Sequence, residues 1–517
     1  MTTQSWYMTS PGKQKLLLLT IFLLTFIELL QAGMVAFASG PILGETGTSP
    51  QEYSFTIASY ACVAIIMISK QRWIVERTGW RFYIAVSLFI FCIGSGVCSQ
   101  SLTYSSFLAG RILMAIGGAS FLTGARVMVN LLPPSPLRFS GVRAFATGLG
   151  AGTALAPFLA SLAVSDDTWS GIFIILIGVA AVTFISASLC LPDEVPDSEL
   201  KSQSHPFLLI SLSAGAFTVL WVLQQSNYNF YSNLLILCII AITGLSALYY
   251  FFSSMVRFNG VPLLMVKELF SNRRYMVGII LFSFCYLMIG LNNYLIPQLL
   301  QGGMGYSWNS IGTWYSVGLS SALVVWLGMS LVLPKRPGAK KFFVAGFLSL
   351  AIYAGLMSEL APDASLIGNI LPALLFNGVF IMMVMATTAM QTFREVQHNE
   401  TVFSHANQIK NMAAQFSTAL GISIATVGMQ WRETLHFSIL NTFITPYNPA
   451  YRETLAKVSQ VYANSVGTSQ ANDMALAWIA QQVKQQAIIL ASLDFYHTIF
   501  CCGLVIALIM GIQKMMR

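Results

Sequence analysis

Charged residues are scarce in this sequence. Only 9% of its 517 residues are charged and 56% are hydrophobic, whereas an ordinary soluble domain carries about 25% charged residues. A water-soluble fold of this length could not hide so much apolar surface. The composition therefore excludes two or three soluble domains, although the chain is long enough for them.

Signatures of catalysis and of metal binding are missing as well. The sequence has no HExxH motif, no GxSxG motif and no phosphate-binding loop, which disfavours an ATP-driven transporter. Its eight cysteines lie within or at the edges of apolar runs, and none has metal-ligand spacing with a histidine. The five histidines are scattered along the chain: His205, His398, His405, His436 and His497. We therefore expect no enzyme activity, no metal site and no cofactor.

Apolar runs are what the sequence has in abundance. Each run approaches the roughly 20 residues that are needed to cross a bilayer. The predicted spans are 15–39, 52–69, 82–99, 104–131, 139–164, 169–191, 206–224, 231–253, 274–300, 308–333, 341–360, 365–392, 404–430 and 487–513. The first run lacks a small-residue cleavage site, so we expect it to remain as a membrane helix.

Polar connections divide these runs into groups of six, two and six. The proline-bearing segment Leu191–Ser204 follows the sixth run, and Phe252–Asn272 follows the eighth. The predicted fold is therefore an all-α integral membrane protein with about 14 transmembrane helices, arranged as two six-helix bundles plus two inserted helices. The expected units are residues 1–192, 193–272 and 273–517.

The charges between the runs indicate how the chain is oriented. If the N-terminus is cytoplasmic, the first six outward connections contain no Lys or Arg. Basic residues such as Arg72, Arg257 and Lys341 occupy the inward connections instead, as the positive-inside rule requires. The outward connections hold acidic residues: Glu45, Glu52, Asp166, Asp167, Glu359 and Asp363. One missed helix would reverse this pattern, so we expect a multi-pass protein of the inner membrane with both termini cytoplasmic.

The net charge of +8 follows from this arrangement and does not imply a nucleic-acid partner. The last outward connection, 431–486, does carry basic residues. Long connections cross a membrane largely regardless of their charge. Within it, Tyr451–Val466 and Ser469–Gln486 are predicted to form amphipathic helices on the outer face.

Several motifs resemble those of the fourteen-helix drug–proton antiporters of the major facilitator superfamily. Between the second and third runs, Arg72–Arg81 resembles the family loop G-x-x-x-D-R-x-G-R. Glu76, Arg77, Gly79 and Arg81 match that loop, and Arg72 stands where its first glycine would be. On the expected cytoplasmic face, we expect these residues to form a gate that meets helix ends such as those of Arg126 and Arg143 and latches one conformation. The alternative is that their charges only set the orientation of the chain.

Two further motifs lie on the fourth and fifth runs. Gly110–Gly118, which includes Arg111, looks like the family signature R-x-x-q-G. Gly148–Ser161 is similar to the antiporter motif G-x-x-x-G-P-x-x-G-G. Small residues let two helices approach closely and a proline bends its helix, so Gly148, Gly152 and Pro157 are further gate candidates. The alternative for this motif is ordinary tight packing.

The sequence departs from the family where protons are coupled. The first helix of the family carries an aspartate in the motif L-D-x-T, and here Gln31 takes its place. Ala414 stands where the thirteenth helix of the family has an arginine, and Lys410 lies one turn earlier. Glu28 precedes Gln31 by three residues, so the two share one helix face. Our hypothesis is that Glu28 supplies the missing carboxylate.

Ionisable groups within a bilayer are costly unless they are paired or hydrated, which makes each a functional candidate. The candidates for proton coupling or substrate binding are Glu28, Gln31, Arg111, Asp494 and His497. The resemblance implies that the helix of Arg111 neighbours the first helix, and we expect Arg111 to lie at the depth of Gln31. We expect Asp494 and His497 to act as a titrating pair one helical turn apart. For each of them the alternative is a purely structural hydrogen bond or ion pair.

Neutral polar residues of the second bundle are candidates for lining a substrate cavity. They are Asn292, Asn293, Tyr294 and Asn377. Taken singly, such residues more often join two membrane helices than contact a ligand.

The sequence therefore favours a secondary active transporter. The first hypothesis, implied by the resemblance, is a proton-coupled exporter of small amphipathic or hydrophobic compounds, of the multidrug efflux type. The second is a dedicated exporter of one metabolite or siderophore, and the third is a membrane-embedded enzyme. The expected partners are a small-molecule substrate, protons, the lipid bilayer and a periplasmic adaptor protein.

Overall fold

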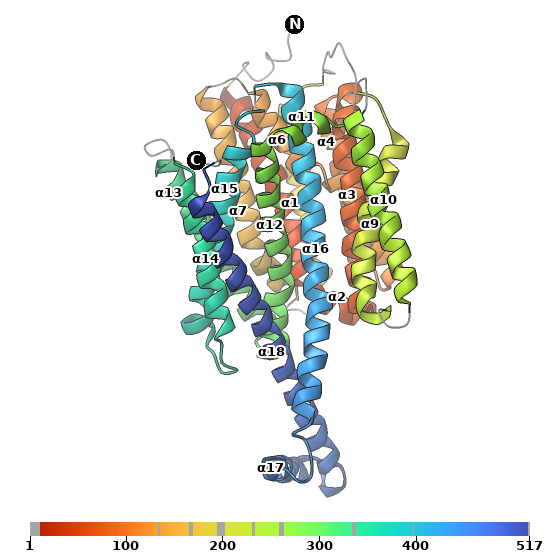
Figure 1. Ribbon diagram of the computed structural model, residues 1–517, viewed down its shortest axis with the longest axis vertical. Helices are drawn as coiled ribbons and strands as arrows, with labels where there is room; N and C mark the ends of the chain where they lie inside the picture. The colour runs from red at the N-terminus through yellow and green to blue at the C-terminus, as the bar shows by residue number, and fades with distance from the viewer. Residues whose placement is uncertain are drawn as a thin grey trace.

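The computed structural model describes residues 11–132, 135–164, 169–193, 202–229, 233–257, 263–332, 338–396 and 398–514. These residues form long, roughly parallel helices and contain no strand (Figure 1). Within them, 14 helical stretches are long and apolar enough to cross a membrane. The predicted all-α membrane fold is thereby confirmed.

The first half of the chain consists of α1 (Pro11–Phe37), α2 (Ser39–Thr46), α3 (Pro50–Thr78), α4 (Trp80–Ser99), α5 (Tyr104–Gly118), α6 (Phe121–Leu131), α7 (Pro136–Val164), α8 (Gly171–Cys190), α9 (Pro206–Asn229) and α10 (Leu234–Arg257). The second half consists of α11 (Val266–Ser271), α12 (Arg273–Pro297), η1 (Gln298–Gly303), α13 (Trp308–Val332), α14 (Lys340–Ser358), η2 (Leu366–Ile370), α15 (Leu371–Thr392), α16 (Glu400–Asn441), α17 (Pro449–Val466) and α18 (Thr468–Ile512).

Helix contacts group these elements into two bundles and a pair. In the first bundle α1 packs against α7 and α8, and α4 against α5 and α8. In the second, α12 packs against α16, and α14 against α15 and α18. α9 and α10 pair with each other at one side, where α9 also touches α3 and α16 (Figure 1). The two bundles meet where α7 packs against α13 and where α3 packs against α16.

Glycines allow α1 and α7 to approach within the first bundle. A Cβ atom on Gly148 would lie 2.0 Å from Thr25 Oγ1, and one on Gly152 would lie 2.6 Å from the Phe26 carbonyl oxygen. Larger residues would therefore force the two backbones apart. The sequence motif that contains Gly148 and Gly152 thus sets a close helix contact.

Two helices continue far beyond the bundles. α16 has 42 residues and α18 has 45, and a helix rises about 1.5 Å per residue. Their far ends project from one face together with α17 (Figure 1). We call this projection the stalk, the face that bears it the stalk face, and the opposite face the terminal face. Because the spans are even in number, α1 begins and α18 ends on the terminal face.

The stalk corrects one prediction. The sequence led us to expect two separate amphipathic helices, 451–466 and 469–486, followed by a membrane helix. The first is α17, but the second is the beginning of α18, which continues unbroken through the last span. Gly467, with a φ of 85°, makes the only chain reversal between α17 and α18. No helix-breaking residue separates Gln486 from the apolar run, so the helix simply continues.

Other boundaries also moved. The fourth predicted span, 104–131, is divided into α5 and α6 at Ala119 and Ser120. α3 extends to Thr78, well past the predicted end at residue 69. The acidic residues Asp166 and Asp167 of the charge argument lie outside the described residues. The division into units at 192 and 272 stays a prediction.

Candidate functional site

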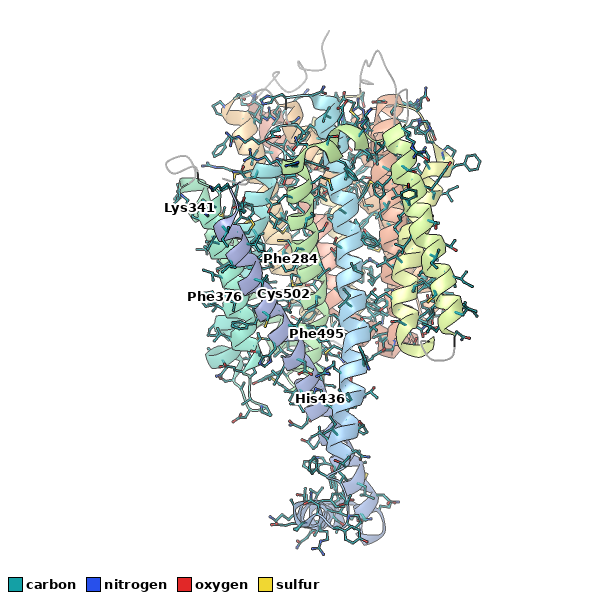
Figure 2. The ribbon with its side chains drawn as sticks, in the orientation of Figure 1. Phe284, Lys341, Phe376, His436, Phe495 and Cys502 are labelled. Atoms are coloured by element: carbon teal, nitrogen blue, oxygen red, sulfur yellow. The ribbon has the colours of Figure 1, made fainter. Side chains whose placement is uncertain are left out.

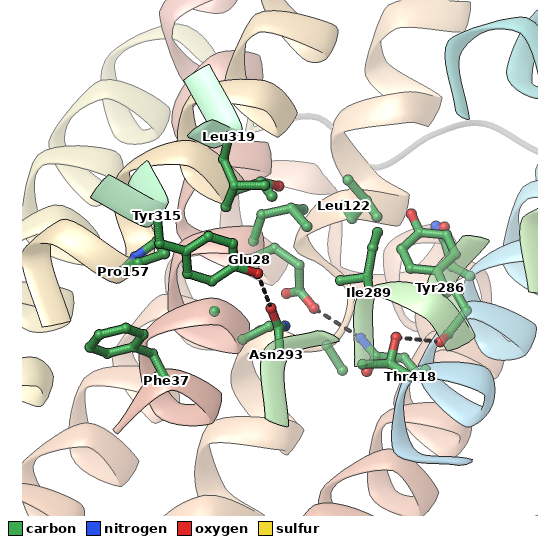
Figure 3. Close-up of a pocket in the computed structure, with 18 residues that line it drawn as sticks. Glu28, Phe37, Leu122, Pro157, Tyr286, Ile289, Asn293, Tyr315, Leu319 and Thr418 are labelled. Carbon is green, nitrogen blue, oxygen red and sulfur yellow. Dashed lines mark hydrogen bonds between the residues drawn. The ribbon is translucent and has the colours of Figure 1, made fainter. Parts of the chain in front are cut away.

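Three cavities lie in series between the two bundles. The central cavity, of about 820 Å³, is lined by Glu28, Pro157, Asn293 and Gln415 among others (Figure 3). The basic cavity, of about 1010 Å³, lies nearer the terminal face and shares Tyr286 with the central one. The mouth cavity, of about 950 Å³, shares Arg126 and Val142 with the basic cavity and reaches Arg138 and His398. Together they trace a route from mid-membrane to the terminal face.

Glu28 is the one acidic side chain in the described lining of these three cavities. Its Oε1 atom accepts a hydrogen bond of 3.0 Å from Gln415 Nε2 of α16. Its Oε2 atom is buried and has no hydrogen-bond partner among the described residues. The carboxylate therefore links the two bundles through one oxygen and leaves the other unsatisfied.

Arg111 lies beside Gln31, as expected from the sequence. Arg111 Nη1 donates to Gln31 Oε1 at 3.1 Å, and Gln31 Nε2 donates to the Tyr60 hydroxyl at 2.9 Å. The guanidinium carbon also lies 4.4 Å from the centre of the Tyr60 ring. Gln31 is neutral and cannot cancel the charge of Arg111. The guanidinium is therefore stabilised by the amide oxygen of Gln31 and by the face of the Tyr60 ring. The Arg111 Nε atom has no partner among the described residues.

The basic cavity contains two cations that line it from opposite bundles. Arg126 of α6 lies over aromatic rings, with its guanidinium carbon 5.6 Å from the Phe145 centroid. Lys410 of α16 is 6% exposed, and its Nζ atom lies 5.1 Å from the Phe282 centroid. We predicted neither residue as a cavity cation. The sequence points to Lys410 through its position in the family alignment. It points to Arg126 as an expected partner of the gate residues.

The four polar candidates of the second bundle lie in different surroundings and do not line one common cavity. Asn293 lines the central cavity, and the Tyr315 hydroxyl lies 3.5 Å from its Oδ1 (Figure 3). Asn292 accepts a buried hydrogen bond of 3.0 Å from the Tyr353 hydroxyl. Tyr294 lines a different cavity at the base of the stalk. Asn377 is fully buried, with neither amide atom hydrogen-bonded to a described residue.

The gate candidates lie at the terminal end of α3. Glu76 accepts hydrogen bonds from Arg72 Nε at 2.6 Å and from Ser202 N and Oγ at 2.7 Å each. Arg72 Nη2 also reaches Thr401 Oγ1 of the second bundle at 3.4 Å. Glu76 thus connects the end of α3 to Ser202, in the segment that follows the first bundle. Arg72 connects the same end of α3 to α16.

Unlike Arg72, the basic residues Arg77 and Arg81 of that loop contact residues of the first half of the chain. Arg77 donates to the Ser202 carbonyl at 3.0 Å, and Arg81 forms an exposed ion pair with Asp193. Gly79 caps α3 with a φ of 80°, a conformation that favours glycine. The expected meeting with Arg126 and Arg143 is not found, because those two guanidinium groups lie over phenylalanine rings.

Near the stalk face, α7 and α13 touch closely. A Cβ atom on Gly312 would lie 2.2 Å from Ser161 Cβ and 2.6 Å from the Pro157 carbonyl oxygen. Ser316 Oγ accepts a hydrogen bond of 2.9 Å from the Phe158 backbone, next to the proline. Pro157 therefore lies where the two bundles close over the stalk end of the central cavity.

Asp494 and His497 do not form the expected pair. Asp494 Oδ2 accepts from Arg432 Nε at 2.7 Å and lies 2.7 Å from His436 Nε2. His497 Nδ1 instead lies 3.0 Å from the Leu493 carbonyl oxygen. His436 marks the base of the stalk, where α16 and α18 run side by side (Figure 2). The carboxylate of Asp494 thus fastens these two helices together.

Comparisons with known proteins agree with the all-α membrane fold. A family model described as Major Facilitator Superfamily matches residues 21–422. Two relatives, from Yersinia pestis (strain Pestoides F) and Yersinia pseudotuberculosis (serotype O:1b, strain IP 31758), are provisionally named multidrug resistance protein MdtD. Each is 25% identical over 413 residues, which span 78% of this chain and 84% of the relative.

Solved structures share the fold at low sequence identity. A bacterial homologue of the human lysosomal transporter Spinster, in an inward-facing and unoccupied conformation, matches with a TM-score of 0.59 and 12% identity over 97% of this chain and 98% of its own. The nucleoside transporter NupG matches with a TM-score of 0.53 and 12% identity over 96% of this chain and 100% of its own.

Proposed function

The chain belongs to the Major Facilitator Superfamily, and from this premise we propose that it is a proton-coupled exporter of small amphipathic or hydrophobic compounds. The relatives provisionally named as multidrug resistance proteins support export as the direction of transport. The central and basic cavities are lined by side chains of both bundles, which is where a transporter of two bundles would hold its cargo.

Glu28 is the observation that carries the proposal. Its carboxylate lies in the central cavity and accepts a hydrogen bond from Gln415 across the boundary between the bundles. When Glu28 binds a proton, one of its oxygens becomes a hydrogen-bond donor, and the electrostatic attraction between its carboxylate and Arg111 is lost. Proton binding therefore changes both the contact between bundles and the charge of the cavity, which is what coupling to a proton gradient requires.

The test is transport by the purified protein in proteoliposomes with an imposed proton gradient. We expect Glu28→Gln to bind cargo but to transport it at a rate that no longer depends on the gradient. Glu359→Gln, at an exposed carboxylate on the stalk face, is the matched control and should behave like the unchanged protein. A gradient dependence that is unaltered in Glu28→Gln would refute the coupling role.

We further propose an inner-membrane location with the terminal face in the cytoplasm, because Lys and Arg concentrate in the connections of that face. The transport units are then residues 1–192 and 273–517, with 193–272 as an accessory pair of helices. The stalk would project into the periplasm, where it is the surface that an adaptor protein would meet. Fluorescent reporter fusions at Gly338 and Pro449 should report opposite sides of the membrane.

A further inference from the structure

The basic cavity combines apolar walls with uncompensated positive charge. Its walls include aromatic and methionine side chains from both bundles: Phe139, Phe145, Phe282, Trp326, Met382 and Met385. Arg126 enters this lining from the first bundle and Lys410 from the second. A compartment of this kind suits a molecule with an apolar body and a negatively charged group.

Neither cation has an anionic partner among the described residues. Among the described residues, no side-chain hydrogen bond or ion pair involves the Arg126 guanidinium or the Lys410 ammonium group, whereas Arg72, Arg274 and Arg432 each pair with a carboxylate. The contacts that remain are to the faces of phenylalanine and tyrosine rings. Such contacts are worth about 0.5–2 kcal/mol, which is less than the several kcal/mol that burying an ion costs.

The mouth cavity, which leads from the terminal face to the basic cavity, is also lined by positively charged residues. The mouth cavity adds Arg138 and His398 to Arg126, and the described lining of the mouth and basic cavities contains no acidic residue. Glu28, the one acid of the series, lies at its far end in the central cavity. Walls of low dielectric focus such a field, so the route attracts anions and repels cations.

We propose that the basic cavity binds an amphipathic organic anion and that molecules of this class are the cargo. The anionic group, a carboxylate or a group of similar charge, lies between Lys410 and Arg126, and the apolar body packs against Trp326 and the phenylalanines. This inference rests on the proposed export function and deepens it by naming the chemical class of the cargo. Because the two cations belong to different bundles, the bound anion draws the bundles together on this side.

Binding of three matched probes to the full chain in lipid nanodiscs tests the proposal. The probes are naphthaleneacetate, its neutral amide and a naphthylmethyl trimethylammonium ion, which share one aromatic body and differ in charge. Quenching of tryptophan fluorescence reports binding, and Trp326→Phe assigns the signal to this cavity. We expect the anion to bind about tenfold more tightly than the amide and the cation to bind most weakly.

Variants then assign the preference to the two cations. Lys410→Met and Arg126→Met should each lower the affinity for the anion about tenfold and leave the amide within about twofold. Lys410→Arg should retain the preference for the anion. Lys457→Met is the matched control, since this lysine is 73% exposed and lies on the stalk. If Lys410→Met does not fold, the order of affinities of the three probes for the unchanged protein decides the question.

Equal binding of acid and amide, tighter binding of the cation, or an unchanged preference in folded Lys410→Met would overturn the proposal. Because binding is measured without a gradient, its result is separate from that of the export test. Anion-selective binding without gradient-driven transport would support this site and refute proton-coupled export. Gradient-driven transport of the cationic probe would support proton-coupled export and refute the anion site.

Discussion

The two bundles meet along two seams whose chemistry differs. The small-residue seam, between α7 and α13, depends on close backbone approach at Gly312 and on a hydrogen bond from the Phe158 backbone to Ser316. The amide seam, where α16 packs against α3 and α6, depends on buried side-chain amides such as Gln408 and Asn411.

This difference indicates which of the two seams can open gradually, one contact at a time. Tight contact between small residues is lost at once when two helices part, because dispersion forces fall steeply with distance. Amide hydrogen bonds can be exchanged for others, one at a time, as a helix turns or slides. Asn407, Gln408 and Asn411 each keep an amide oxygen without a partner among the described residues, which leaves room for such exchange. We therefore expect the small-residue seam to be the less tolerant of the two.

Gly312→Val should have the largest effect. Its new Cβ would overlap Ser161, and overpacking of this kind costs about 1–3 kcal/mol. We expect cargo efflux from proteoliposomes to fall about tenfold or more, in keeping with a penalty of that size. Gly328→Val, on the same helix with open space around its Cβ position, is the control. Normal efflux in Gly312→Val at matched protein levels would show that this seam need not close tightly.

Gln408→Leu should have an intermediate effect. Its amide nitrogen donates to the Ile68 carbonyl at 2.8 Å, and a hydrogen bond of this type contributes about 1 kcal/mol. We expect efflux to fall about threefold to fivefold, with a lower melting temperature measured in detergent. Thr434→Val, whose hydroxyl bonds only within its own helix, is the control. A loss greater than that of Gly312→Val would reverse the ranking of the two seams.

Thr401→Val should have the smallest effect. The contact from Arg72 to Thr401 Oγ1 is long, at 3.4 Å, and Arg72 keeps its ion pair with Glu76 without it. We expect efflux to change less than about twofold, because long and partly exposed hydrogen bonds contribute little. Ser438→Ala, at an exposed hydroxyl that bonds within its own helix, serves for comparison. A strong loss specific to Thr401→Val would instead place the main latch at the terminal face.

The lengths of the apolar runs predicted the fold well, because a bilayer demands about 20 apolar residues for each span. They predicted helix ends poorly where polar residues continue a helix. Arg72 and Glu76 lie on the last turns of α3, which a hydropathy argument ends at residue 69. The same reason explains why the helical start of α18 was assigned to a separate outer helix.

Contacts between site residues could be predicted only where a family motif indicated which helices are neighbours. The resemblance placed Arg111 beside Gln31, and the structure has the two in contact. Sequence spacing pairs Asp494 with His497, yet the structure places Asp494 against His436, which lies 58 residues away in the chain. Membrane helices are apolar on nearly all sides, so periodicity does not say which face meets a cavity. The position of Lys410 and Arg126 in one compartment needed the folded chain.

The length of α16 has a mechanical consequence. Gln415, beside the central cavity, and Asn441, at the far end of the stalk, belong to one continuous helix. At about 1.5 Å per residue, some 39 Å of stiff rod separates them. A tilt of about 10° at the level of the cavity would then displace the tip by roughly 7 Å. The stalk is thus a lever that magnifies small rearrangements around the cargo, and a spin label near its tip would report them from outside the membrane.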